Sequence, residues 1–391
     1  MLVAKLYAYA LLSEFILIYP VYALLFDDAG LSVAETSSLF VIWSVTGMVL
    51  EIPSGAWADA VSRRLLLCLG PLLAGLGYAL WILYPSYWVF ALGFVLWGAQ
   101  GALVSGAYEA LSYEELERLG RQDRYVTVMG RATSIGLVGA ASAMGLAVPV
   151  FAAGSYLAVG AASVLACVLC AVMALALPEH RTRGGGADGG RYWAILRAGV
   201  EQARTDRGVL HAVLLLAFVT AIWGALEEYV PFLAAEAGAA KAAIPLLVLL
   251  VWLGATAGGL LSGVAARFGF RRFALTIALA ALAMAAGAIS GHVAGFALIA
   301  VAFGAFQLAG VVADARLQER ITGESRATVT SVAGLGDGLL TVAVYTSYGA
   351  MSPYVSHGTT FALLILPYAL IALFAARRSP ADTSTPPRPG Q

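Results

Sequence analysis

The sequence predicts an all-α membrane protein with twelve transmembrane helices, arranged as two pseudo-symmetric six-helix bundles. Three observations predict this fold class. Hydrophobic residues make up 61% of the 391 residues, charged residues only 12%, and the mean hydropathy is +0.85. Apolar runs long enough to cross a bilayer recur along the chain, and segments of its two halves resemble each other in order. Soluble proteins carry about twice this share of charge.

The transmembrane spans follow from the apolar runs, because about 20 apolar residues cross the hydrocarbon core as a helix. The first run is longer than the apolar core of a signal peptide and lacks a small-residue cleavage site after it, so we expect it to remain in the mature chain. The predicted spans are 6–26, 36–58, 65–84, 87–112, 127–150, 155–177, 209–235, 243–266, 272–291, 294–318, 327–350 and 357–376.

The arginines predict the orientation. Every arginine lies in a loop after an even-numbered span, at the span ends beside such a loop, or in the C-terminal tail. Lys241 is the one basic residue of the opposite loops, which also hold Asp27, Asp28 and Glu35. Since cytoplasmic loops are rich in Lys and Arg, we expect both termini in the cytoplasm. High alanine content and the preference for Arg over Lys favour a bacterial source, and hence the bacterial inner membrane.

The longest polar stretch divides the chain. We predict an N-terminal bundle at 1–177, a cytoplasmic linker at 178–208, a C-terminal bundle at 209–378 and a disordered tail at 379–391. The linker is rich in glycine in its first half, which is typical of flexible segments. Its second half, 192–206, could form an amphipathic helix on the membrane surface.

The two bundles are related by an internal repeat. Gly55, Arg63 and Arg64 follow the second span with the same spacing as Gly263, Arg271 and Arg272 follow the eighth. Glu109 matches Asp314, Arg131 matches Arg326, and the region of Pro20 matches that of Pro231. Six spans per half give parallel repeats, which place a substrate site near the midplane between the bundles.

The loop after the second span resembles that of the major facilitator superfamily, and the resemblance covers all twelve spans. Gly55, Asp59, Arg63 and Arg64 match the family pattern G-x-x-x-D-x-x-G-[RK]-[RK], with Ser62 in place of the second glycine. The resemblance implies a cytoplasmic latch that stabilises an outward-facing state; a purely topogenic loop is the alternative. Residues 51–55 and 105–110 look like a bacterial subgroup of drug or metabolite exporters. The fifth span lacks the central Gly-Pro of the family's antiporter motif.

Carboxylates inside the spans are the first candidates for mechanism, because each costs about 2.5–3.5 kcal/mol at a helix centre. Those near the cytoplasmic ends have basic residues at the same depth. We predict the pairs Glu109–Arg131 and Asp314–Arg326. The predicted cytoplasmic gate comprises Glu51, Gly55, Asp59, Arg63, Arg64, Glu109, Arg131, Arg267, Arg271, Asp314 and Arg326.

Four other intramembrane acids have no basic residue at their depth: Glu14, Glu227, Glu228 and Asp337. Such a group can carry a proton or neutralise a cationic substrate; a hydrogen bond to a neighbouring helix is the alternative. Consecutive helical residues differ by about 100° in direction, so we expect one of the Glu227–Glu228 pair to face the cavity. The family places spans 1, 4, 7 and 10 around that cavity. The candidate cavity-lining residues are Tyr19, Tyr22, Gln100, Tyr108, Trp223, Tyr229, Phe306, Gln307 and Tyr345, the aromatic ones being either cavity-lining or lipid-facing.

These features favour proton-coupled export of small amphipathic or cationic organic molecules, drugs or secondary metabolites, by alternating access. A proton-coupled uptake symporter for a nutrient or organic cation is the alternative. A membrane-embedded enzyme is disfavoured because we find no nucleophile–base or metal constellation. A non-transporting sensor is disfavoured because we expect no room for an added soluble domain. The expected partners are a small-molecule substrate, protons and the lipid bilayer, with no nucleic acid. We expect no cofactor, no metal site and a monomer.

Overall fold

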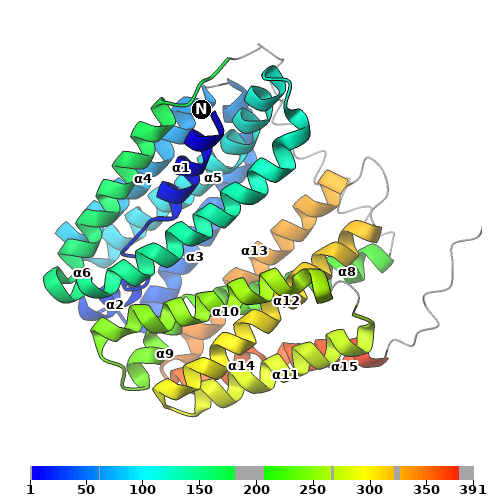
Figure 1. Cartoon of the computed structure of the whole chain (residues 1–391). Coiled ribbons are helices and arrows are strands. Elements are labelled where there is room, and N and C mark those ends of the chain that lie inside the picture. Colours follow the sequence, from blue (N-terminus) through cyan, green and yellow to red (C-terminus); the bar gives the residue numbers. More distant parts are fainter. Residues whose placement is uncertain (1, 61, 181–206, 266–267, 321–325, 378–391) are drawn as a thin grey trace, which may run out of the picture.

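The computed structural model describes residues 2–60, 62–180, 207–265, 268–320 and 326–377, with the side chains of 52–60, 207, 263–265, 326–328 and 374–377 excepted. Within these ranges the chain is helical and contains no strand. Figure 1 shows two groups of helices, one built by 2–175 and the other by 207–377. The predicted surface helix at 192–206 and the tail from 379 lie outside the described residues.

The helices of the first half follow the predicted spans closely. The first span is broken: α1 ends at Glu14 and α2 begins at Tyr22. The fifth and sixth spans form one element that bends at Gly154 and Ser155, where Ser155 adopts a φ of 56°. The helices are α1 (Leu2–Glu14), α2 (Tyr22–Asp28), α3 (Val33–Ala60), α4 (Arg63–Leu83), α5 (Tyr87–Arg118) and α6 (Tyr125–Leu175).

The second half repeats this order. The seventh span is broken between α8 and α9, just as the first is between α1 and α2, and the twelfth is broken at Ile365. The helices are α8 (Arg207–Glu227), α9 (Val230–Glu236), α10 (Ile244–Ala265), α11 (Phe270–Ile289), α12 (Phe296–Arg320), α13 (Arg326–Met351), α14 (His357–Leu364) and α15 (Leu366–Arg377).

Proline accounts for the three breaks. Pro20 comes just before α2, Pro231 lies in the first turn of α9, and Pro367 is the second residue of α15. Proline lacks the N–H that a helix interior needs but is accepted in the first turn, where that N–H has no partner. Each break therefore begins a new helix instead of ending the span.

The predicted fold class of twelve spans is confirmed. Among the described residues, nine helical segments are long and apolar enough to cross a membrane. One of them, Gln122–Leu175, contains the fifth and sixth spans. The first and twelfth spans are each made of two shorter helices, α1 with α2 and α14 with α15.

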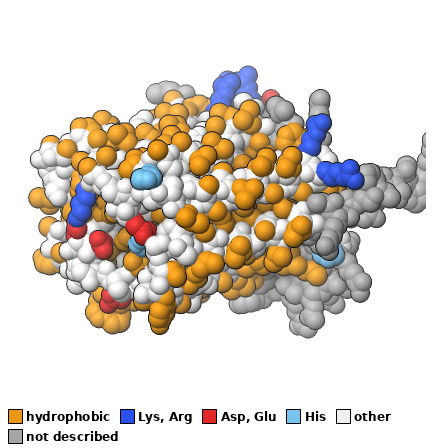
Figure 2. All heavy atoms as spheres, turned by 90° about the horizontal axis from the view of Figure 1, so that it is seen from below, with side chains coloured by type: hydrophobic (Ala, Val, Ile, Leu, Met, Phe, Trp, Pro, Cys, Tyr) orange, Lys and Arg blue, Asp and Glu red, His pale blue; other side chains and the backbone are white. Residues whose placement is uncertain are grey.

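Charge separates the two ends of the molecule. The arginine end, as we call it, holds the end of α5, the start of α6 and the starts of α4 and α11. The acidic end holds Asp27, Asp28, Glu35 and Glu236, together with Lys241. On the face that Figure 2 shows, apolar side chains cover the middle, acidic ones gather toward one end and most Lys and Arg side chains lie toward the other. This distribution suits a body surrounded by lipid.

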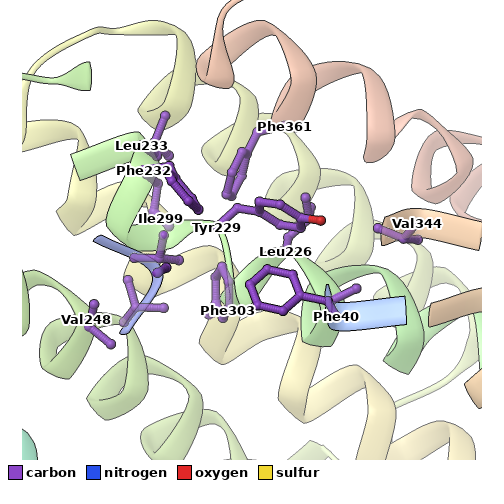
Figure 3. Packing of buried hydrophobic residues seen from close by; sticks show 14 of the residues in the cluster. Phe40, Leu226, Tyr229, Phe232, Leu233, Val248, Ile299, Phe303, Val344 and Phe361 are labelled. Atoms are coloured by element: carbon purple, nitrogen blue, oxygen red, sulfur yellow. The ribbon is translucent and has the colours of Figure 1, made fainter. Parts of the chain in front are cut away.

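The two halves meet toward the acidic end. The Tyr229 hydroxyl donates to Ser37 Oγ at 2.8 Å, and Lys241 forms an ion pair with Asp28. Phe40 of α3 packs beside Tyr229, with ring centroids 5.4 Å apart, as Figure 3 shows. Toward the arginine end the two groups of helices diverge in Figure 1. The halves are thus closed against each other at the acidic end.

Candidate functional site

The broken seventh span places two carboxylates at the boundary between the halves. Helix α8 ends at Glu227, so Glu228 lies in the turn before α9. The Glu227 carboxylate accepts hydrogen bonds from the Tyr19 hydroxyl, at 3.0 Å, and from the indole N–H of Trp252. Tyr19 itself lies in the break of the first span, between α1 and α2. The two helix breaks therefore meet through this hydrogen bond.

Glu228 is also held by tyrosines of the first half. Its carboxylate accepts hydrogen bonds from the hydroxyls of Tyr22 and, at 3.4 Å, Tyr19, and the residue is only 7% exposed. We expected one of the two carboxylates to face the cavity. Instead, both reach the Tyr19 hydroxyl, and neither residue lines either of the two cavities described below. The 100° relation applies within a helix, and the helix ends at the first of the two residues.

A cavity of about 190 Å³ lies next to this carboxylate pair. Tyr19, whose hydroxyl donates to both carboxylates, lines this cavity together with Glu14, Trp97, Gln100 and Trp252. The ring of Tyr19 meets Trp97 and Trp252 edge-on, with centroids 6.1 and 6.0 Å apart. Because Trp97 belongs to α5 and Trp252 to α10, both halves contribute to this aromatic wall.

A second cavity of about 430 Å³ continues toward the arginine end. It shares Ser13, Glu14 and Trp252 with the first cavity and adds Tyr108 and Glu109. The Glu14 carboxylate is exposed to this space and forms no hydrogen bond or ion pair with any described residue. The described residues that line the two cavities include two glutamates but no Lys, Arg or His. The combined space is therefore acidic and partly aromatic.

The remaining predicted cavity residues are placed differently. Tyr22, Tyr229, Phe306 and Tyr345 are buried in aromatic packing and line neither of these two cavities. Trp223 and Gln307 do not line them either. Asp337 accepts a 2.5 Å hydrogen bond from Thr220 of α8, which joins two helices of the second half. Of the candidates, Tyr19, Gln100 and Tyr108 line the cavities.

At the arginine end, Arg63 of the predicted latch is packed against the first half. It forms an ion pair with Glu114 of α5, and its side chain is only 12% exposed. Its backbone N–H donates to Glu179 at 2.7 Å, and Ser62 Oγ donates to the same carboxylate at 2.5 Å. The start of α4 is thus fixed to α5 and to the residues that follow the sixth span.

Glu115 binds His180, the residue that follows Glu179. Its carboxylate accepts a 2.7 Å hydrogen bond from the backbone N–H of His180 and one of 3.3 Å from Arg118. Partial burial raises the pKa of Glu115, but the hydrogen bonds from His180 and Arg118 outweigh it and leave the pKa below the usual value. Sequence reasoning missed Glu114, Glu115 and Glu179, because acids beyond the ends of spans are common on solvated surfaces.

The other gate residues fall into three groups. Outside the described part of the chain lie the side chains of Asp59 and Arg326, the burial of Gly55 and all of Arg267. Glu51, Arg64 and Arg271 are exposed, and Asp314 is exposed and accepts a 3.4 Å hydrogen bond from Gln318. Glu109 and Arg131 are both exposed and form no ion pair with each other. In this conformation, that predicted pair is not formed.

Two tryptophans of the cavity wall were also missed as site residues. Trp97 and Trp252 line the first cavity, and Trp43 stacks on Trp97 with centroids 4.9 Å apart. Their intramembrane position was a possible signal, because tryptophan is more usual at the membrane interface. Which face of a helix they occupy depends on how the helices pack.

Comparison with solved structures shows the same architecture at low sequence identity. A point mutant of the nucleoside transporter NupG has a TM-score of 0.79 at 13% identity, covering 96% of this chain and 98% of that one. A D-xylose-proton symporter gives 0.67 at 17%, with 98% of each chain covered. A bacterial homologue of the human lysosomal transporter Spinster, inward-facing and unoccupied, gives 0.70 at 15%, with coverage of 96% and 95%.

At these sequence identities, the structural similarity is evidence for the fold alone. No curated protein sequence matches the chain. Residues 6–340 match the family model described as Major Facilitator Superfamily. This multi-pass membrane protein therefore belongs to the Major Facilitator Superfamily and is a transporter, not an enzyme.

Proposed function

We propose that the protein exports small amphipathic or cationic organic molecules in exchange for protons, across a bacterial cytoplasmic membrane with the arginine end inside. The observation that carries this proposal is the cavity around Glu14. It contains an unpaired carboxylate, phenol rings of the first half, indole rings of both halves, and no basic residue among its described lining.

The cavity chemistry suits a cation with an apolar body. Aromatic faces attract cations, and the attraction grows when the site excludes water. Glu14 supplies the counter-charge, while Trp97, Trp252 and Tyr19 supply apolar and aromatic surface. An anionic substrate would meet two glutamates and no compensating charge from the described lining. In the proposed orientation, the cavities are loaded from the cytoplasm.

The carboxylate pair provides the coupling step. Tyr19 contacts the cavity with its ring and the Glu227–Glu228 pair with its hydroxyl. Two like charges this close favour binding of a proton. A proton on Glu228 weakens its acceptance from Tyr22, one of the hydrogen bonds that join the halves at their closed side. Exchange requires Glu228 to take up its proton while the acidic end is open and to release it toward the arginine end. Release of the proton then restores the hydrogen bond from Tyr22 that closes the acidic end.

The test is transport by purified protein in liposomes with an imposed pH gradient. Tetraphenylphosphonium serves as the cationic amphipathic probe, and a pH-sensitive dye in the lumen reports proton movement. We expect Glu14→Gln to reduce probe transport and Glu227→Gln or Glu228→Gln to uncouple it from the pH gradient. Glu117→Gln is the matched control, because Glu117 is exposed beyond the fourth span and lines neither cavity. Unchanged coupled transport in all three site variants would refute the proton-carrier role.

A proton-coupled uptake symporter remains the second candidate. It is favoured by one observation: the fifth span, the first part of α6, lacks the Gly-Pro pair typical of antiporters in the family. The two functions differ in the direction of coupled flux. A symporter moves probe and protons the same way in the liposomes, whereas an exporter of this kind moves them in opposite directions.

A further inference from the structure

A long groove opens on the outer surface of the second half, between α11 and the pair α14–α15. These helices pack side by side, as Figure 1 shows. The groove has a volume of about 650 Å³ and is separate from the cavities around Glu14. Alanines of both elements line it, among them Ala274, Ala278, Ala281 and Ala369.

The sides of the groove are leucines that project outward. Leu275 and Leu282 of α11 are 58% and 66% exposed, and Leu366 and Leu373 of α15 are each 57% exposed. Alanine between such leucines leaves a channel that no side chain of the described residues fills. In a membrane protein, this surface faces lipid, so the channel is open to lipid chains.

Charge marks one end of the groove. Arg271, in the first turn of α11, is the one charged residue among the described residues that line it. Its side chain is exposed and forms no hydrogen bond or ion pair with any described residue. An unpaired guanidinium at the membrane boundary attracts an anionic headgroup.

The length of the groove matches a lipid tail. From Arg271 to Ala285 the lining residues follow one face of α11, and 14 helical steps span about 21 Å. Half of the hydrocarbon core is about 15 Å thick. When the phosphate of a phospholipid lies at Arg271, its acyl chain can therefore follow the groove across the full thickness of one leaflet.

We propose that this groove binds one anionic phospholipid, with an acyl chain along the alanines and the phosphate on Arg271. The arrangement disfavours a second copy of this chain, because a symmetric partner would bring two Arg271 side chains into an apolar contact without a counter-charge. The proposal depends on neither the substrate nor the direction of transport.

The test is lipid titration of the delipidated full-length protein, followed by native mass spectrometry. Phosphatidylglycerol is compared with phosphatidylcholine of the same acyl chains. Ala281→Trp fills the groove, and we expect it to reduce binding of both lipids at least tenfold. The control Ala286→Trp makes the same change on an exposed position of α11 outside the groove and should leave binding unchanged.

The headgroup contact is tested separately. Arg271→Gln should weaken binding of phosphatidylglycerol about fivefold, the effect of one basic residue near a membrane surface, and should spare phosphatidylcholine. Arg272→Gln is the control, because Arg272 is exposed but does not line the groove. Equal losses in both arginine variants would overturn the headgroup site. Unchanged lipid binding by Ala281→Trp, or a dimer in light scattering that this variant abolishes, would overturn the acyl-chain site. Size-exclusion profiles check that each variant is folded. Should Ala281→Trp aggregate, the comparison of Arg271→Gln with Arg272→Gln still tests whether the lipid binds at this site.

Discussion

The packing of α10 on α12 gives a sharp test of the helix arrangement around the cavity. Gly258 of α10 lies so close to α12 that a Cβ added to it would be 1.8 Å from the carbonyl oxygen of Gly304. Gly254, one turn earlier, would bring a Cβ within 2.1 Å of the carbonyl oxygen of Ala300. Small residues at this spacing let two membrane helices touch through their backbones.

Gly258→Ala should therefore destabilise the protein. An ordinary Cβ contact begins near 3.4 Å, so α10 and α12 must separate by about 1.6 Å at this point. The obstructing atom is backbone and cannot rotate away, which places the cost near the top of the usual overpacking range of about 1–3 kcal/mol. Replacing glycine in a helix returns about 1 kcal/mol. We expect a net loss of about 2 kcal/mol.

Gly259→Ala is the matched control, one residue away. A Cβ there meets only the side chain of Gln307, at 3.8 Å, which is ordinary contact. This variant gains helix propensity without a clash and should be neutral or up to about 1 kcal/mol more stable. The comparison isolates the close helix approach, because both variants make the same chemical change in the same helix.

The assay is thermal unfolding of the purified variants in one detergent. We expect Gly258→Ala to unfold at a temperature several degrees below the wild type and Gly259→Ala at or above it. Transport should fall with Gly258→Ala even below its melting temperature, because Trp252 lies on the same helix and holds Glu227. Equal melting temperatures for the two variants would show that α10 and α12 are not in backbone contact.

Three further outcomes follow from other contacts. Lys241→Ala removes the ion pair with Asp28 and should loosen the acidic end, measured as a longer distance between spin labels on the two halves. Partial burial raises the pKa of Asp28, but hydrogen bonds from Lys241 and a tyrosine outweigh it and lower the pKa overall. The ion pair therefore persists at pH values above the usual aspartate pKa and is lost only as the pH falls below that pKa. Tyr19→Phe keeps the ring in the cavity wall but removes the hydroxyl, so probe binding should survive while coupling to the pH gradient is lost; loss of binding instead would show that the hydroxyl contacts substrate. Glu114→Gln removes one carboxylate that pairs with Arg63 and should lower stability by about 1 kcal/mol in detergent unfolding, whereas no change would mean that this pair contributes nothing.

The order and number of the spans were predictable because membrane insertion is a local property. An apolar run of sufficient length is a span regardless of its neighbours. The breaks near Pro20, Pro231 and Pro367 were not predicted, and proline alone does not mark them, because Pro71 and Pro149 lie inside continuous helices. The repeat predicted that the first and seventh spans correspond, and both are broken in the structure. The sequence also selected Glu14 and Glu227 as candidates, from the cost of an acid in lipid, and Tyr19 as an aromatic residue at similar depth.

Long-range packing decided how these candidates meet. Tyr19 and Glu227 are far apart in the chain and touch only because the two halves close on each other. The convergence of Glu227 and Glu228 on one hydroxyl depends on the residue at which α8 ends, which periodicity does not resolve. Trp97 and Trp252 became cavity walls through the rotation of α5 and α10, which is set by neighbouring helices.

The sequence by itself thus determined which segments lie in the membrane and which acids must be there for a reason, because transfer from water to lipid acts on each segment separately. The tertiary structure alone decided that Arg63 pairs with Glu114, that Glu14 stays unpaired, and that α11 and α15 leave a groove between them. These features depend on distances between helices that are remote in sequence, and no local property of the chain contains those distances.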